Sequence, residues 1–217
     1  MRRIIVVLGL LSAPLAARGQ ETCQTGEAGL YYQTLLAPDS LGRPEWTHRG
    51  FFEGWTQISE KFGTWGFSFV EAGYVSALGG LSYAPIQFGE CSVLEFGLSA
   101  GFEAERPEES EAFQRFNRYG GYVYLGDERR FAEYYTEFGS SGTEWTRITV
   151  NLGLSKNFAL GGFCQLGSES DATDGCGPRL TFTGKKMFTY SAWFSPMLWL
   201  GDKGFLFGGA VAAERRK

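Results

Sequence analysis

The feature that most constrains this chain is a strict alternation of side-chain types between Ser92 and Glu105. The stretch reads SVLEFGLSAGFEAE, with apolar residues at every even position from 94 to 104 and mostly small or charged residues at the odd positions. Because successive side chains of a β-strand point to opposite faces, the pattern predicts a strand with one continuous apolar face. Thr146–Lys156 repeats the arrangement, with apolar residues at positions 148, 150, 152 and 154.

Two closed all-β architectures fit this alternation, and they differ in which way the apolar face turns. A soluble barrel packs its bulky apolar side chains inside and shows its polar face to water. A membrane barrel is inverted, with the apolar face in contact with lipid. Here the non-apolar face is rich in Gly and Ser, which suits a lumen better than a solvated surface. Aromatic residues form 16% of the chain and gather near expected strand ends, as interfacial girdles do. We therefore predict the membrane orientation, with a soluble secreted barrel or sandwich as the alternative.

Length, charge and hydropathy limit the other classes. The chain has 217 residues and a formal net charge of −4, which gives no basic footprint for nucleic acid. A chain of this length forms one domain with a full core. After the N-terminal region the chain has no apolar run of 18 residues, so the sequence excludes a transmembrane helix in the rest of the chain.

Residues 1–19 have the pattern of a secretory signal peptide. Arg2 and Arg3 form a positive start, Ile4–Leu11 is an apolar stretch too short to span a bilayer, and Ala17–Gly19 supplies small residues for cleavage before Gln20. An uncleaved anchor or a buried N-terminal helix is the alternative. Residues 20–217 are then one β-barrel domain in an oxidising compartment. No cysteine lies at the cleavage site, which argues against a lipoprotein.

The remaining segments divide into about twelve expected strands, with ten as the lower count. Every long connection has odd rank and every even-ranked connection is short, as an up-and-down antiparallel barrel across a membrane requires. The first connection is expected over Pro38–Arg49, a short turn at Gly79–Gly80, and a short helix within Pro107–Arg118. Trp65, with the aromatic residues at 67 and 69, shares parity with Glu71, so either a β-bulge intervenes or the carboxylate faces lipid. The bulge is the preferred prediction, because a charge in lipid is costly.

The four cysteines fit this architecture. Cys164 and Cys176 flank a polar stretch whose hairpin would bring them together. Cys23 precedes the first strand, and Cys91 starts the fifth at an expected short turn on the same side of the barrel. We predict that all four form disulfides. No CxxC or CxxH spacing occurs, so no metal site is predicted.

Ionisable and amide side chains on the non-apolar parity are the candidate lumen residues. They form either a salt-bridged interior that stiffens the wall or the lining of a narrow aqueous path. The predicted lumen-lining set is Glu95, Glu103, Glu133, Glu137, Arg147, Asn151 and Arg179, with the two arginines as candidate partners for the glutamates.

Two other polar features are weaker indications of function. His48 is the only histidine, and the sequence puts it in the first long connection near Ser40 and Asp39, where a lipid-modifying enzyme would need a base and a nucleophile. No nucleophile motif surrounds it, so a solvated loop imidazole is the preferred interpretation. The acidic stretch at 169–174 could supply oxygen ligands to Ca²⁺. Its spacing matches no calcium loop, and a solvated loop is preferred. No cofactor is predicted.

Together, the signal peptide and hairpins such as YGGYVYLGDERRFAEYYTEFG and TRITVNLGLSK resemble those of bacterial outer-membrane β-barrel proteins. The resemblance covers nearly the whole mature chain, but it is architectural. It implies an outer-membrane location, contact with lipid and the barrel-assembly machinery, and small polar solutes as candidate permeants. The leading hypothesis is a passive, narrow, porin-like channel or a structural wall protein without catalysis. The alternatives are a lipid-modifying outer-membrane enzyme and a soluble barrel that binds an apolar ligand.

Overall fold

A computed structural model describes residues 23–38, 43–106, 112–167, 175–185, 188–198 and 204–216. The expected signal peptide at 1–19 and the acidic stretch at 169–174 lie outside these residues, as do Asp39 and Ser40. Each of the twelve elements is a β-strand, and the described residues contain no helix long and apolar enough to cross a membrane. The strands are β1 (Gln24–Pro38), β2 (Pro44–Gln57), β3 (Phe62–Glu71), β4 (Tyr74–Phe88), β5 (Ser92–Glu105), β6 (Gln114–Gly126), β7 (Arg130–Gly139), β8 (Glu144–Gly153), β9 (Phe158–Gly167), β10 (Gly175–Lys185), β11 (Thr189–Met197) and β12 (Gly204–Arg216).

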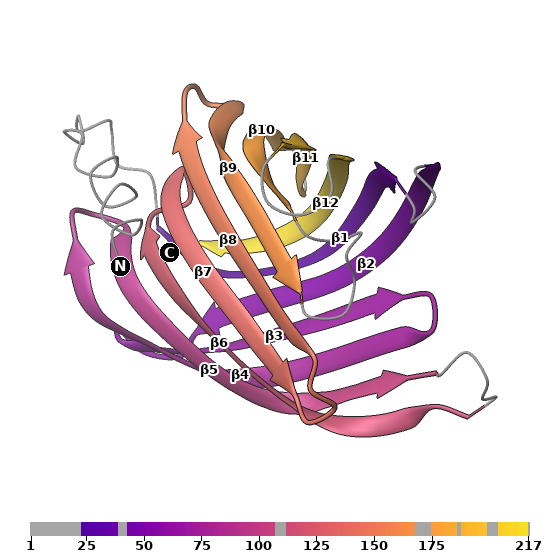
Figure 1. Cartoon of the computed structure of the whole chain (residues 1–217). Coiled ribbons are helices and arrows are strands. Elements are labelled where there is room, and N and C mark those ends of the chain that lie inside the picture. Colours follow the sequence, from indigo (N-terminus) through magenta and orange to yellow (C-terminus); the bar gives the residue numbers. More distant parts are fainter. Residues whose placement is uncertain are drawn as a thin grey trace, which may run out of the picture.

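The strands form one closed barrel in which each pairs antiparallel with its neighbours in sequence (Figure 1). The closing seam pairs β1 with β12 over a register that runs from Gln24 and Arg216 to Leu36 and Phe205. This is the up-and-down topology predicted from the sequence, at the predicted count of twelve. Closure pairs every strand on both sides, which leaves no unsatisfied sheet edge to meet lipid.

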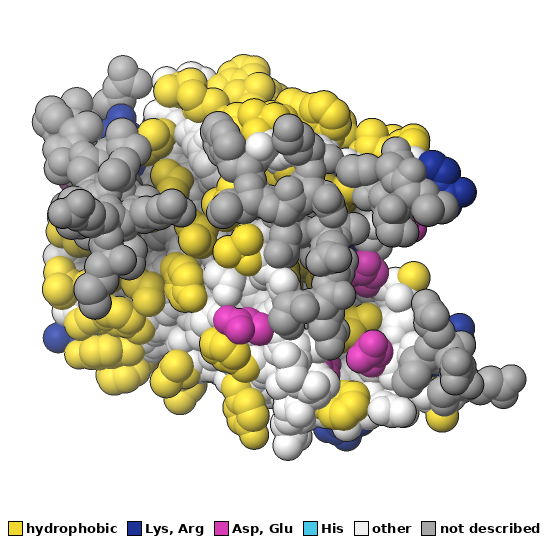
Figure 2. Space-filling view, in the orientation of Figure 1, with side chains coloured by type: hydrophobic (Ala, Val, Ile, Leu, Met, Phe, Trp, Pro, Cys, Tyr) yellow, Lys and Arg dark blue, Asp and Glu magenta, His cyan; other side chains and the backbone are white. Residues whose placement is uncertain are grey.

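The apolar face of the strands points outward. Leu98 is 77% exposed and Phe96 is 42% exposed, whereas Glu95 and Arg147 line the interior. Figure 2 shows hydrophobic side chains spread over the outer surface. Other large apolar side chains exposed on the barrel include Leu30, Val70, Leu81, Tyr119, Leu160, Leu180 and Val211. Such a surface is far larger than the apolar patches that soluble monomers tolerate, so the membrane orientation is correct and the soluble barrel is excluded.

Pairs of aromatic side chains lie on this outer surface near the short turns, where an interfacial girdle is expected. Phe62 packs on Tyr83 with ring centroids 5.0 Å apart, and Phe158 packs on Phe182 at 5.2 Å. The side chain of Arg130 is exposed near a strand end, where water and headgroups solvate a charge more cheaply than the bilayer centre does.

Two ends of the barrel can be distinguished by their connections. The short-turn end carries the even-ranked connections 58–61, 89–91, 127–129, 154–157 and 186–188, together with the start of β1 and the end of β12. The long-loop end carries the odd-ranked ones. Among these, 106–113 and 168–174 are long, as predicted, and the last connection, 198–203, is longer than the expected turn at Gly201–Gly204.

The sequence pattern misplaced the connection between β3 and β4. The expected turn at Gly79–Gly80 is wrong, because both residues lie inside β4 and pair with β3 and β5. The chain instead turns at Ala72–Gly73, where Gly73 has a positive φ of 78° that glycine adopts without strain. This odd-ranked connection is therefore among the shortest. The rule that long connections have odd rank holds, but its converse does not.

Two other local expectations are corrected. The first connection is shorter than predicted, because β2 already begins at Pro44 and pairs with β1 along its full length. His48 therefore lies in a strand and not in a loop. The expected short helix is not formed over Gln114–Arg118, which belongs to β6, and positions 107–111 lie outside the described residues.

Candidate functional site: the barrel interior

The alternating pattern that coats the outside with apolar side chains turns charged, small and aromatic side chains inward. The aromatic share was not predicted. Phe51, Trp65, Phe67, Leu78 and Tyr135 form a buried cluster inside the barrel. The expected β-bulge in β3 is wrong, because β3 pairs without a break with β2 up to Val70 and with β4 through Glu71. The aromatic side chains and the carboxylate share parity because all of them face the interior.

Contacts across the lumen pinch the barrel. The ring of Phe67 on β3 lies 5.5 Å from that of Tyr135 on β7 and 6.3 Å from that of Trp145 on β8. Trp65 lies 5.8 Å from Tyr135. Since β3 is not a neighbour of β7 or β8 in the closed sheet, these rings meet through the interior. We call this the pinned side of the lumen, and the wall formed by β1 and β9–β12 the open side.

An ion pair bridges the same gap. Arg147 on β8 donates to Glu133 Oε1 on β7, with an Nη2–Oε1 distance of 2.8 Å. The same Nη2 atom lies 3.6 Å from Glu53 Oε1 on β2, across the lumen. The guanidinium group also stacks over Tyr135 at 5.3 Å. Arg147 therefore ties opposite walls together at mid-depth.

A second charge cluster is sealed between β5, β6 and β7 toward the long-loop end. Arg118 donates to both Glu103 and Glu137, and its Nη1 also lies 2.9 Å from Thr143 Oγ1. Glu103 accepts a hydrogen bond from Tyr74 at 2.9 Å. The two carboxylates are each 1% exposed and the arginine 4%. Charges this buried are tolerated only when they are paired and hydrogen-bonded.

The open part of the interior is a cavity of about 1610 Å³ that reaches from the short-turn end to mid-depth. Its described lining has nine acidic side chains and five basic ones. The acidic set is Glu27, Glu53, Glu60, Glu90, Glu95, Asp127, Glu128, Glu133 and Glu214, and the basic set is Lys61, Arg129, Arg147, Lys156 and Arg179. The excess of carboxylates gives the cavity a negative potential that concentrates cations.

The predicted lumen residues all face inward, but they fall into separate groups. Glu95, which accepts a hydrogen bond from the Tyr122 hydroxyl, lies on the cavity wall with Asn151. Glu133 and Arg147 form the ion pair described above. Glu103 and Glu137 are in the sealed cluster, and their partner is Arg118 and not one of the predicted arginines. Parity within β6 would have identified Arg118, which shares parity with inward Tyr122 and lies next to outward Tyr119.

A glycine makes room for this crowded interior. A side chain at Gly97 would collide with the ring of Tyr122 and with Trp65 Nε1. The absent Cβ therefore lets an aromatic side chain from the neighbouring strand lie flat over β5.

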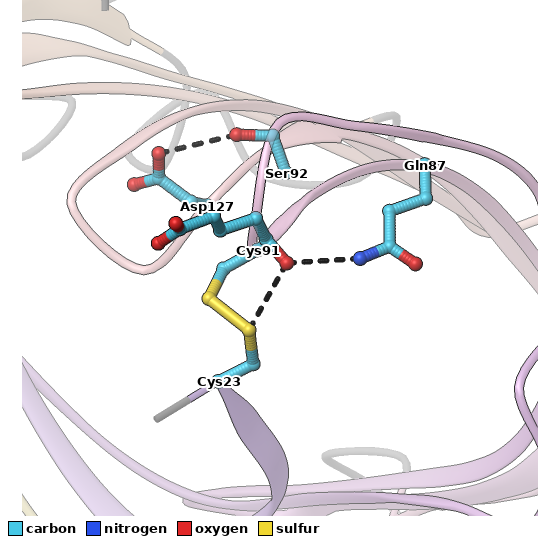
Figure 3. The surroundings of a disulfide bond; sticks show 6 residues. Cys23, Gln87, Cys91, Ser92 and Asp127 are labelled. Atoms are coloured by element: carbon cyan, nitrogen blue, oxygen red, sulfur yellow. Dashed lines mark hydrogen bonds between the residues drawn. A yellow bond between two sulfur atoms is a disulfide. The ribbon is translucent and has the colours of Figure 1, made fainter. Parts of the chain in front are cut away.

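The mouth of the cavity is crossed by a disulfide. Cys23, just before β1, is bonded to Cys91 in the turn between β4 and β5, with 5.3 Å between their Cα atoms. These strands are not neighbours in the closed sheet, so the bond spans the short-turn end as a strap. Gln87 Nε2 donates to the Glu90 carbonyl at 2.9 Å beside it (Figure 3). A register shift between Tyr83 and Ile86 bends this end of the hairpin.

The second disulfide joins Cys164 and Cys176, which are directly paired on β9 and β10. It lies at the base of the connection 168–174, toward the long-loop end. The described residues contain no free cysteine and no cluster of three or more metal-ligating side chains.

His48 lies on the outer face of β2. Its Nδ1 is 2.7 Å from the hydroxyl oxygen of Tyr32 and 2.9 Å from Thr34 Oγ1, both on β1. These are cross-strand contacts, and neither partner is a carboxylate. The arrangement is a polar contact on the outer face of the wall between β1 and β2.

Comparison with known proteins places this fold. No protein-family model matches the sequence, and no curated protein matches it. Among solved structures, an outer-membrane channel from Pseudomonas putida F1 superimposes with a TM-score of 0.53 and 8% identity, over 94% of this chain and 99% of the other. OmpF from Salmonella typhi, in complex with daunomycin, gives a TM-score of 0.34 and 7% identity over 87% and 97% of the two chains.

The closed, lipid-facing barrel has the fold of the outer-membrane β-barrels. The superposition with the Pseudomonas channel covers nearly the full length of both chains. At 8% identity this likeness shows the fold. What the interior does follows from its own residues.

Proposed function

We propose that this protein is an outer-membrane channel that passes small polar solutes passively and prefers cations. The short-turn end faces the periplasm, as in barrels of this architecture. The observation that carries the proposal is the large cavity that enters the barrel from this end and is lined by charged and polar side chains. A wall protein with no transport role needs no such cavity.

The geometry supports a narrow path. The pinned side is closed at mid-depth by the Phe67 and Tyr135 rings and by the ion pair between Arg147 and Glu53. The cavity continues on the open side, where Tyr31, Phe163, Arg179 and Trp193 are part of its lining. A solute that enters from the short-turn end therefore reaches mid-depth along β1 and β9–β12. Solutes the size of hydrated ions suit this route better than bulky ones.

The preference for cations follows from the lining charge. The described lining residues include nine carboxylates and five cationic groups, and charges concentrated in a low-dielectric cleft raise the local concentration of counter-ions. Because salt screens this field over about 8 Å at physiological ionic strength, the preference is expected to weaken as salt is raised.

Reconstitution in planar bilayers tests the proposal. We expect discrete conductance steps and a reversal potential that favours K⁺ over Cl⁻ in a salt gradient. Neutralising two mouth carboxylates with the pair Glu90→Gln and Glu128→Gln should reduce the preference without abolishing the steps. Correct folding is checked by the heat-dependent shift in gel mobility that folded barrels show. Folded protein without conductance steps at any voltage would overturn the channel and leave a structural role.

A further inference from the structure

Arg179 differs from Arg49, Arg118 and Arg147 because it has no anionic partner among the described residues. Arg49, Arg118 and Arg147 each form ion pairs with glutamates. Within the described part of the chain, Arg179 makes neither an ion pair nor a hydrogen bond, and its buried Nε atom has no acceptor. Its guanidinium carbon lies 4.8 Å from the ring centroid of Trp193 and 5.6 Å from that of Phe163. Two aromatic rings hold a cation whose hydrogen-bonding capacity is unused.

Other unsatisfied polar atoms lie around it. Thr181 is two residues along β10 on the same face, and its buried Oγ1 has no hydrogen-bond partner in the described structure. Trp193 pairs with Thr181 in the sheet and is 6% exposed, and its Nε1 also has no acceptor. All three residues line the cavity. Buried donors without acceptors are costly and rare in folded proteins, so this group is a candidate for completion by a ligand.

The surroundings are strongly apolar beyond this point. Leu35, Ala37, Phe163, Met197 and Leu206 form a buried cluster contributed by β1, β9, β11 and β12. Phe163 belongs to this cluster and to the cavity lining, so it joins the site of Arg179 to the apolar cluster. The ring of Tyr31 lies 6.4 Å from that of Trp193 on the same wall. A ligand at this point meets one unpaired cation and several aromatic faces.

We propose that the open side of the lumen binds an aromatic carboxylate, with its carboxylate at Arg179 and its ring against Trp193 and Phe163. The planar guanidinium group forms paired hydrogen bonds with a carboxylate, and ring faces stack favourably. A monoanion fits better than a phosphate dianion, because the acidic cavity repels a second negative charge. The proposal rests on the proposed function only in that solutes must be able to enter the cavity.

Binding is tested by calorimetry on the folded, detergent-solubilised barrel, with benzoate as the probe. Benzyl alcohol supplies the ring without the charge, acetate the charge without the ring, and inorganic phosphate a second anion. We expect saturable binding of benzoate and at least tenfold weaker binding of the other three. A tenfold loss equals about 1.4 kcal/mol of binding free energy.

Matched variants assign the site. Arg179→Gln should weaken benzoate binding at least tenfold. The benzoate affinity of Arg179→Lys should lie between those of the wild type and Arg179→Gln, because lysine keeps the charge but not the planar donor pair. Arg129→Gln removes the same charge from the same cavity near its mouth and should change the affinity less than twofold. Equal losses in Arg179→Gln and Arg129→Gln would overturn the site in favour of general electrostatic attraction. Binding of benzyl alcohol equal to that of benzoate would overturn the role of the cation.

The two proposals fail in different ways. Conductance without saturable benzoate binding would refute the carboxylate site and leave the channel. Saturable binding that Arg179→Gln abolishes, in a barrel that conducts no ions, would support the site and refute the channel. Each variant is first shown to be folded by its heat-dependent gel mobility, so loss of binding cannot be attributed to loss of the barrel.

Discussion

The two sides of the lumen use arginine in opposite ways. On the pinned side, Arg118 and Arg147 form ion pairs with carboxylates from neighbouring or facing strands, and these pairs hold the strands together. On the open side, Arg179 is held by aromatic rings and keeps its donors free. The difference teaches that burial of a charge in a barrel does not define its role. Whether its hydrogen-bonding capacity is used by the protein separates a structural cation from a binding one.

The largest expected effect is on stability, and it separates the two sides directly. Arg118→Leu leaves Glu103 and Glu137 buried without a cation, which should lower the free energy of unfolding by about 3–5 kcal/mol. Arg179→Leu removes an unpaired charge and should lower it by less than about 1 kcal/mol. Urea unfolding in phospholipid vesicles measures both. Similar losses in the two variants would show that the comparison is wrong.

The second largest loss of stability is expected when the disulfide between Cys23 and Cys91 is removed. Cys23→Ser with Cys91→Ser removes a cross-link between segments 68 residues apart, and we expect a loss of about 2–4 kcal/mol because the unfolded chain gains freedom. The single-channel conductance should rise, since the mouth is no longer tied. Cys164→Ser with Cys176→Ser is the control. The disulfide that it removes joins residues only 12 apart in the sequence, and it does not lie at the mouth. An unchanged conductance in the first variant would show that the strap does not limit the aperture.

The smallest effect is expected for the ion pair that crosses the lumen. Glu53 lies 3.6 Å from Arg147, and its side chain is partly exposed to the cavity, so Glu53→Gln should cost less than about 1 kcal/mol of stability. Arg147 keeps its closer partner, Glu133. The preference for cations should fall slightly in the reversal-potential measurement, because one lining carboxylate is lost. A stability loss as large as that of Arg118→Leu would mean that the pinned side depends on this contact.

The sequence predicted the wall better than the contents of the lumen. In Ser92–Glu105 the apolar and polar residues are cleanly separated by parity, so the strand and its outward face were predicted correctly. In β3 the aromatic residues share a face with Glu71, and alternation alone cannot say that this face points inward. Its partners across the lumen, Tyr135 and Trp145, decide that. Such contacts join strands that are far apart in the sequence, and no local pattern contains them.

The candidate site shows the same limit. Arg179 was placed in the lumen from its parity, but as a partner for the glutamates. Its surroundings are set by β9 and β11, which supply Phe163 and Trp193. Arg118 was missed because it lies where the expected short helix and the next expected strand overlap, whereas pairing on both sides holds it in β6. Closing the sheet overrides local propensity here.

The bond between Cys23 and Cys91 also bears on how the protein is made. It encloses β1–β4 in a covalent ring, which would hold these four strands together before the seam with β12 exists. Oxidation of these thiols then belongs to biogenesis as much as strand pairing does. A cell that exported this chain without a thiol oxidant would deliver the same strands to the membrane with the start of β1 left loose.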